Sequence, residues 1–268
     1  MKDKFRKYFD INKDSWNKKS PVHFTSDFYN VTGFKSGDLS LYHIELEELK
    51  EVQGKSILHL QSHFGLDTFS WERLGAKAVG IDFSEKSIEL AEVLKVELGS
   101  SARFLCVNLY DLNENILDEK FDVIYSSYGA ITWLPDLDEW AKIIFKYLKP
   151  GGIFYLVDFH PLLICFNHLE SPHITTPYFT SKPIRKSYQG TYTNPDAAID
   201  IIEYTWNHSI SEILSSFVQN GFRIDFFHEF PYIPFKCFPN LERTPDGNYQ
   251  MKDQPDIPLT FSLQTSKK

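Results

Sequence analysis

The feature that most constrains the fold is an alternation that begins near residue 56, where short apolar runs take turns with segments of helical periodicity. This pattern is typical of strands and crossover helices in a parallel sheet. The expected strands cover residues 57–60, 78–81, 103–107, 121–126, 153–157, 222–227 and 259–263. The expected helices cover residues 67–74, 85–98, 137–148 and 210–220. We therefore predict an α/β fold with a doubly wound, mostly parallel sheet.

Two regions fall outside this rhythm. Residues 1–52 are expected to form an N-terminal helical cap that includes a helix over 39–52, in front of a main domain over 53–268. Residues 160–207 are proline-rich and aromatic, and we interpret them as an insertion whose segments 185–193 and 199–206 resemble two ribbon strands. Its aromatic residues are expected either to cover a substrate pocket or to pack the ribbon on the sheet: Tyr178, Tyr188, Tyr192, Tyr204 and Trp206.

Composition narrows the class of protein. A chain of 268 residues with 42% hydrophobic content can bury a core without disulfides. Cys106, Cys165 and Cys237 are scattered without metal-ligand spacing, which favours reduced thiols and the cytoplasm. The net charge of −8 disfavours a nucleic-acid partner, and no export signal or membrane span is visible. The oligomeric state is not encoded in these features.

In a doubly wound sheet, ligands bind beyond the carboxyl ends of the strands. Asp82 ends the second expected strand, where a carboxylate can accept hydrogen bonds from both ribose hydroxyls of a nucleoside; the alternative is a structural acid at a helix N-terminus. Phe83 could lie on an adenine ring, or it could belong to the core. A nicotinamide dinucleotide is disfavoured, because Gln61 and His63 would crowd the approach of a pyrophosphate to the loop.

Motifs at the strand ends carry a family resemblance. They are Ile57-Leu58-His59-Leu60-Gln61-Ser62-His63-Phe64-Gly65, Gly80-Ile81-Asp82-Phe83-Ser84, Asn108-Leu109-Tyr110-Asp111-Leu112, Phe121-Asp122-Val123-Ile124 and Leu148-Lys149-Pro150-Gly151-Gly152. The last motif, between a helix and a strand, is the most diagnostic. With these motifs the chain resembles the class I S-adenosylmethionine-dependent methyltransferases, in their small-molecule, bacterial-like branch.

The resemblance implies a Rossmann-like sheet of seven strands with an antiparallel last strand, and S-adenosylmethionine as the cofactor. It implies that Gly65 and its loop contact the methionine part of the cofactor. Asp82 would bind the ribose, Asn108 and Leu109 the adenine edge, and Ser126 or Ser127 the amino-acid end. The sequence departs from the family pattern at Gln61 and His63, which stand at glycine positions, and at Asn108, which stands for an aspartate. Gln61 could itself hydrogen-bond the cofactor's carboxylate or ammonium.

Methyl transfer requires alignment and, where the nucleophile carries a proton, a base. His160 follows the fifth expected strand and is the first candidate; the alternative is a structural histidine that caps the turn at Pro161. His208 is the second candidate, against local backbone bonding. Tyr128 would stand near the transferred methyl or form part of a pocket wall. No metal is expected, because His59 and His63 lie in a strand and a turn and are not aligned by a helix.

These observations predict an enzyme that transfers a methyl group from S-adenosylmethionine to an oxygen or nitrogen of a small-molecule acceptor. The alternative is a non-catalytic regulatory protein of the same fold that binds an S-adenosyl ligand or another nucleoside. The departures from the glycine pattern are what keep that alternative open.

Overall fold

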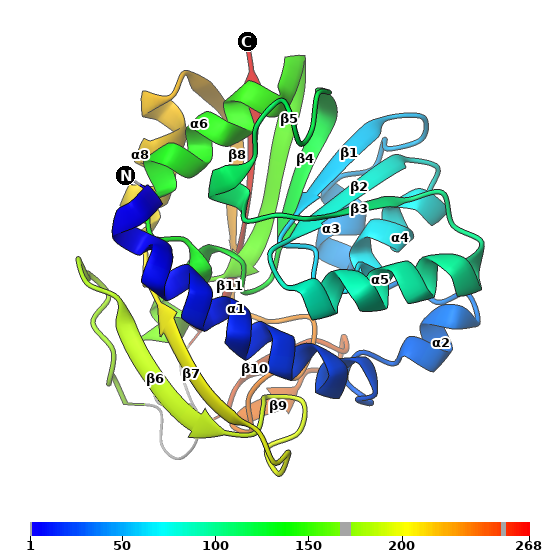
Figure 1. The fold of residues 1–268 in the computed structure, drawn as a ribbon. Helices are drawn as coiled ribbons and strands as arrows, with labels where there is room; N and C mark the ends of the chain where they lie inside the picture. Colours follow the sequence, from blue (N-terminus) through cyan, green and yellow to red (C-terminus); the bar gives the residue numbers. More distant parts are fainter. Residues whose placement is uncertain (1, 167–172, 253–255) are drawn as a thin grey trace.

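A computed structural model describes residues 2–166, 173–252 and 256–268, and its main element is a seven-stranded sheet in the order β3-β2-β1-β4-β5-β11-β8 (Figure 1). The strands are β1 Ser56–Leu60, β2 Lys77–Asp82, β3 Arg103–Cys106, β4 Phe121–Ser127, β5 Leu148–Phe159, β8 Phe222–Phe230 and β11 Thr260–Lys267. β1 to β5 pair in parallel, whereas β11 pairs antiparallel with both β5 and β8. The predicted doubly wound α/β fold with an antiparallel last strand is therefore confirmed.

Helices cover both faces of the sheet (Figure 1). Helices α4 Leu66–Arg73 and α5 Glu85–Leu98 lie on one face and α6 Leu137–Tyr147 and α8 Ile210–Gln219 on the other. The side chains of Trp140 and Phe217, from α6 and α8, are fully buried against Phe154 of β5. On the opposite face Trp71 of α4 packs edge-on against Tyr125 of β4. Successive side chains of a strand point to opposite faces of the sheet, which is why one core lies on each side.

The N-terminal residues form three helices, α1 Lys2–Phe24, α2 Val31–Lys35 and α3 His43–Glu48. The expected helix over 39–52 was too long, because only six of its residues are helical. The chain leaves the helix at Leu49, and Leu49 and Val52 are then buried in the core beside β1. Gly54 makes the turn with a positive φ of 77° and donates its N–H to the carbonyl of Gly75. Tertiary burial thus overrides the helical periodicity.

The insertion contains α7 Pro161–Ile164 and an antiparallel ribbon of β6 Ile184–Gln189 and β7 Asp200–Thr205. The excursion between β8 and β11 holds a short hairpin, β9 Leu241–Arg243 with β10 Tyr249–Met251, which the sequence did not lead us to expect. Two short 3-10 helices, η1 Leu109–Asp111 and η2 Ile131–Trp133, follow β3 and β4. The hairpin was not expected because β9 and β10 have three residues each, too few for a period-2 pattern to be recognised in the sequence.

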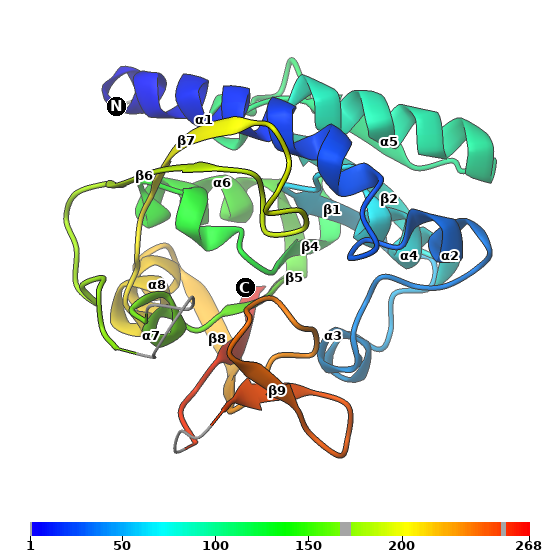
Figure 2. The ribbon, with the colours of Figure 1, turned by 90° about the horizontal axis from the view of Figure 1, so that it is seen from below.

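These added segments surround the carboxyl edge of the sheet, which Figure 2 shows from below. Helix α1 crosses this edge and contacts α5 on one side and β7 on the other. The β6–β7 ribbon and the β9–β10 hairpin lie on two further sides (Figure 2). No helix formed by the described residues is long and apolar enough to cross a membrane.

Candidate active site

The loop after β1 keeps a glycine-like backbone although two glycine positions of the family pattern are substituted. Gln61, His63 and Gly65 all have positive φ, at 55°, 51° and 83°. A residue with a Cβ atom loses about 1–2 kcal/mol in this left-handed region. Gly65 has a further constraint, because a Cβ atom there would lie 2.5 Å from the ring of Phe104. The loop therefore has the required shape but needs side-chain contacts to hold it.

Gln61 supplies one such contact, because its Nε2 donates to the carbonyl oxygen of Ala130 at 3.0 Å. This bond ties the loop after β1 to the loop after β4. The other amide atom, Oε1, is buried and has no hydrogen-bond partner among the described residues. A buried acceptor without a donor is energetically unfavourable. Gln61 thus presents an acceptor to whatever ligand binds at this edge.

His63 supplies the second contact, through a chain of hydrogen bonds whose direction can be worked out. Ser20 Oγ donates to the carbonyl oxygen of Trp16 at 2.7 Å, so its single hydrogen is used. Ser87 Oγ, 2.7 Å from Ser20 Oγ, must then donate to it. Ser87 can only accept from His63 Nδ1, which lies 3.0 Å away. His63 therefore carries its proton on Nδ1.

The same chain continues from His63 into helix α1 and the insertion. His63 Nε2 lies 3.1 Å from His23 Nδ1 and accepts its proton. His23 Nε2 in turn accepts from the hydroxyl of Thr191, at 2.9 Å. Burial lowers the pKa of His63 and lowers that of His23 to about 3, so both rings are neutral. The loop after β1, the cap and the insertion are thus joined by one directed chain.

Asp82 ends β2 and lies next to this loop. Its Oδ2 accepts from the backbone N–H of His63 at 2.9 Å and its Oδ1 from that of Ser84 at 2.8 Å. Burial raises the pKa of Asp82 to about 6, although these backbone bonds oppose the shift. Each carboxylate oxygen retains a second lone pair for a ligand hydroxyl. Phe83, beside it, is half-buried and belongs to none of the hydrophobic clusters.

Asn108 and Leu109 follow β3. The Asn108 Oδ1 atom accepts from the N–H of Tyr110 at 3.0 Å and so caps η1, while Leu109 is buried in the core. Tyr110 stacks on Phe9 of α1 with ring centroids 5.4 Å apart. The cap therefore reaches over the ends of β2 and β3.

The loop after β4 is held from two sides. Asp158, at the end of β5, accepts from the backbone N–H groups of Gly129 and Ile131. Ser127 Oγ donates to Asp67 Oδ2 at 2.9 Å, which joins this loop to the start of α4. Ser126 faces the opposite side of the strand, and its hydroxyl is buried without a partner among the described residues.

Two carboxylates at this edge, the half-buried Asp67 and the fully buried Glu45, were not foreseen as functional residues. Asp67 accepts hydroxyl hydrogens from Ser40 and Ser127. Glu45 of α3 is fully buried and accepts from Tyr128 Oη at 3.0 Å. Burial raises the pKa of both groups, that of Glu45 to about 8. The local signal for Glu45 was its place three residues after Tyr42 at the start of α3, where its side chain accepts from the Tyr42 N–H.

Aromatic rings gather around Tyr128. Tyr42, Tyr128, Phe159 and Phe235, which we call the edge aromatic group, come from four separate parts of the chain. Phe235 stacks on Tyr42 at 4.9 Å and meets Tyr128 edge-on at 5.1 Å. Phe159 lies 6.2 Å from Tyr128 and 5.9 Å from Phe235. Tyr128 remains only half-buried within the group.

His160, the first candidate for a base, has a structural partner at each ring nitrogen. It caps α7, with its Nδ1 accepting from the N–H of Leu162 at 3.1 Å. Its Nε2 lies 2.9 Å from Glu229 Oε1 of β8, and its ring meets Phe261 of β11. These contacts correspond to the alternative role at the Pro161 turn. We therefore do not carry His160 forward as a base.

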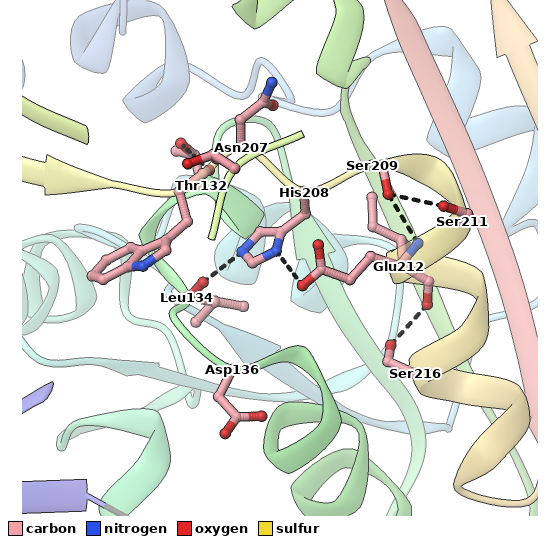
Figure 3. Close-up of polar contacts among 12 residues, drawn as sticks. Thr132, Leu134, Asp136, Asn207, His208, Ser209, Ser211, Glu212 and Ser216 are labelled. Carbon is pink, nitrogen blue, oxygen red and sulfur yellow. Dashed lines mark hydrogen bonds and ion pairs between the residues drawn. The ribbon is translucent and has the colours of Figure 1, made fainter. Parts of the chain in front are cut away.

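His208 is also occupied on both sides (Figure 3). Its Nε2 lies 2.6 Å from the carbonyl oxygen of Leu134, and its Nδ1 lies 3.0 Å from Glu212 Oε1. Both partners are acceptors, so neither ring nitrogen is free to take a proton from a substrate. The neighbouring Trp206 and Thr132 exchange two backbone-anchored hydrogen bonds, and the whole segment fastens the insertion to η2. His208 therefore has a structural role, in which it joins the residues before α8 to the loop after β4.

A buried ion pair joins the cap to the insertion. Lys19 of α1 bonds Glu203 of β7, and their side chains are 3% and 6% exposed. Tyr188 Oη also donates to Glu203, at 3.0 Å. The Lys19 ammonium lies 5.0 Å from the ring centroid of Trp16 and 5.2 Å from that of Trp133. We call this pair with its three rings the cap clasp.

Three further aromatic residues of the insertion contact the N-terminal cap, whereas the packing considered for them was against the sheet. Tyr204 and Trp206 pack on Tyr8 of α1, with ring centroids 4.7 Å and 5.8 Å apart. Tyr192 bonds the hydroxyl of Tyr29 and keeps half of its surface exposed. Most of these rings thus attach the insertion to the cap.

Among residues 2–166, 173–252 and 256–268, no group of three or more His, Cys, Asp and Glu side chains could hold a metal ion. His59 instead bonds the hydroxyl of Thr68 at 2.9 Å, and burial lowers its pKa to about 3.

Comparison with known proteins agrees with this geometry. Residues 58–156 match the family described as methyltransferase domain. A ubiquinone biosynthesis O-methyltransferase of Pseudomonas syringae pv. tomato is 27% identical over 172 residues, which are 60% of this chain and 73% of the relative. Residues 58–156 are a class I S-adenosylmethionine-dependent methyltransferase domain. A demethylmenaquinone methyltransferase of Lactococcus lactis matches this methyltransferase at 35% identity over 138 residues, half of the chain and 49% of the relative.

Solved structures share the fold of the methyltransferase. An S-adenosylmethionine-dependent methyltransferase from Clostridium acetobutylicum superposes with a TM-score of 0.58 at 14% identity, over 92% of this chain and 94% of that one. One from Mesorhizobium loti gives 0.55 at 19% identity, over 87% and 100%. The fold therefore extends well beyond the matched family segment.

Proposed function

We propose that this methyltransferase acts on a small aromatic acceptor bound at the carboxyl edge, and that the methyl group goes to an oxygen or nitrogen, with a hydroxyl oxygen favoured. The observation that carries the proposal is the edge aromatic group, which surrounds the half-buried Tyr128 on the loop after β4. Flat aromatic faces provide contact area for a ring-shaped acceptor. The names of the relatives, which include an O-methyltransferase of ubiquinone biosynthesis, also support a hydroxylated aromatic acceptor.

The residues at the strand ends fit the cosubstrate. The Asp82 carboxylate has lone pairs available for the ribose hydroxyls, and the unpartnered Oε1 of Gln61 can accept from the ammonium group. Gly65 and the backbone of His63 would border the methionine part, and Ser126 or Ser127 its amino-acid end. When bound, S-adenosylmethionine supplies an electrophilic methyl carbon on a sulfonium.

The adenine would lie between Phe83 and the residues after β3, Asn108 and Leu109. A place for Phe83 against the adenine is supported because its side chain is half-buried and belongs to none of the hydrophobic clusters. Asn108 has used one lone pair of Oδ1 on Tyr110 and keeps a second for the adenine amino group.

The setting we propose is the cytoplasm, with small molecules and not nucleic acids or membranes as partners. The three cysteines are free thiols, which supports a reducing compartment. The net charge of −8 is unfavourable for binding polyphosphates.

Incubation with methyl-tritiated S-adenosylmethionine and a panel of catechol, aniline and an aliphatic alcohol tests the proposal. We expect label in catechol, less in aniline and none in the alcohol. Phe235→Ala should raise the KM for catechol about tenfold, because it removes one aromatic face, and should leave the Kd for S-adenosylmethionine unchanged. Labelling of the alcohol alone, or of none of the panel, contradicts an aromatic acceptor.

A further inference from the structure

The side chain of Tyr128 stands where the two loops that border the cosubstrate meet. Its backbone N–H donates to the carbonyl of Val157 at 2.9 Å, and Asp158 holds the next residue, Gly129. The adjacent Ser127 bonds Asp67, two residues beyond the loop after β1. The backbone around Tyr128 is therefore held on both sides, and its side chain remains half-buried.

Its hydroxyl has one partner, which is Glu45. The Tyr128 Oη atom donates to Glu45 Oε2 at 3.0 Å, and Glu45 Oε1 accepts from the Tyr42 N–H at 2.9 Å. Glu45 is fully buried, and among the described residues it has no lysine or arginine within ion-pair distance. A buried carboxylate without a cation is unfavourable for stability and calls for another explanation.

The surroundings of Glu45 bias it toward holding a proton. The titratable groups that face it are Tyr42 at the N-cap of its helix, Asp67 of α4, Tyr125 and Tyr128 of β4 and its loop, and Tyr155 of β5. None of these groups is cationic, and burial raises the pKa of Glu45 to about 8. A carboxylate with such a value is close to the optimum for taking up a proton near neutral pH.

We propose that Tyr128 and Glu45 form a proton relay for the acceptor, in which Tyr128 contacts the acceptor hydroxyl and Glu45 acts through Tyr128. This inference rests on the proposed function. It explains why a tyrosine hydroxyl inside the edge aromatic group is joined to a buried, cation-free carboxylate. His160 and His208, the histidines considered for this role, are both engaged elsewhere.

The step balances in atoms and charge. The acceptor oxygen attacks the methyl carbon, and the carbon–sulfur bond breaks with its electron pair left on sulfur. The acceptor proton goes to Tyr128 Oη while the Tyr128 proton goes to Glu45 Oε2. The positive sulfonium becomes a neutral thioether and the negative carboxylate a neutral acid, so the reacting groups end without charge. Glu45 then loses its proton to water before the next turnover.

The test compares Glu45→Gln and Tyr128→Phe with Glu48→Gln. Glu48 is a matched control, because it lies on the same helix and accepts from a buried tyrosine, Tyr155, at 2.7 Å. With catechol, wild type and the control should show a kcat that rises with pH to a plateau above about 8. Both relay variants should lose about 100-fold in kcat and lose this inflection. Their Kd for S-adenosylmethionine, measured by calorimetry, should stay within twofold of wild type, a readout that also reports folding.

A second substrate separates the relay from a structural effect. Dimethylaniline has no proton on its nucleophilic nitrogen, so the two relay variants should methylate it as fast as wild type does. Glu45→Asp should recover part of the catechol rate and restore the inflection. The relay is refuted if Glu45→Gln keeps the wild-type rate and profile with catechol, or if it slows dimethylaniline as strongly as catechol. If wild type methylates no aromatic acceptor, the proposed function fails and the relay fails with it.

Discussion

The cap clasp allows a quantitative prediction. Lys19→Met would leave Glu203 buried, with Tyr188 as its remaining donor. An uncompensated buried carboxylate escapes most of its desolvation penalty by taking up a proton. At pH 7 that uptake costs about 4 kcal/mol, from the distance between pH 7 and an ordinary glutamate pKa of about 4.3. Near pH 5 the same uptake costs only about 1 kcal/mol.

The free energy of unfolding of Lys19→Met should therefore fall by about 4 kcal/mol at pH 7 and by about 1 kcal/mol at pH 5, relative to wild type. Lys19→Met/Glu203→Gln should lie within about 1 kcal/mol of wild type at both pH values, because neither charge remains buried. Urea unfolding followed by tryptophan fluorescence measures these differences.

Lys18→Met is the matched control, because Lys18 is the next residue of α1 and its ion pair with Asp14 is exposed. It should change stability by no more than about 0.5 kcal/mol. The reasoning is refuted if Lys19→Met costs less than about 1 kcal/mol at pH 7, or if its cost is the same at pH 5 and pH 7.

Three further predictions concern the site. Gly65→Ala should lower the unfolding free energy by about 2–4 kcal/mol, because of its positive φ and the contact with Phe104; a melting temperature equal to that of wild type contradicts this. Asp82→Asn should weaken S-adenosylmethionine binding about 10- to 100-fold, and the wild-type affinity should fall below about pH 6 as Asp82 takes up a proton; calorimetry that finds equal affinities removes Asp82 from the ribose site. Because the pKa of Glu45 is raised to about 8, wild type loses stability as the pH rises from the ordinary glutamate pKa toward about 8. The unfolding free energy of Glu45→Gln should therefore gain up to about 5 kcal/mol on that of wild type between pH 5 and pH 9. A difference in urea unfolding that stays constant over this range contradicts the prediction.

The sequence by itself determined the sheet and the position of the loops that follow its strands. Strand and helix periods are local properties, and so are the turn residues after them, which is why Asp82, Gly65 and the Leu148–Gly152 motif could be placed before the structure was known. The same local reasoning accounts for the helix caps at Ser84 and Ser209, whose hydroxyl oxygens accept from the backbone N–H groups of Ser87 and Glu212. It overextended the helix over 39–52, because burial of Leu49 and Val52 is a tertiary effect.

Only the tertiary structure decided which polar side chains meet. Tyr128 and Glu45 are 83 residues apart, and Lys19 and Glu203 are 184 apart, so no local pattern could pair them. His160 shows the converse: topology put its backbone at the carboxyl edge, but its side chain turns toward β8 and β11. Periodicity fixes which elements form, whereas the direction of a side chain between them depends on the packing and hydrogen bonds of segments distant in sequence.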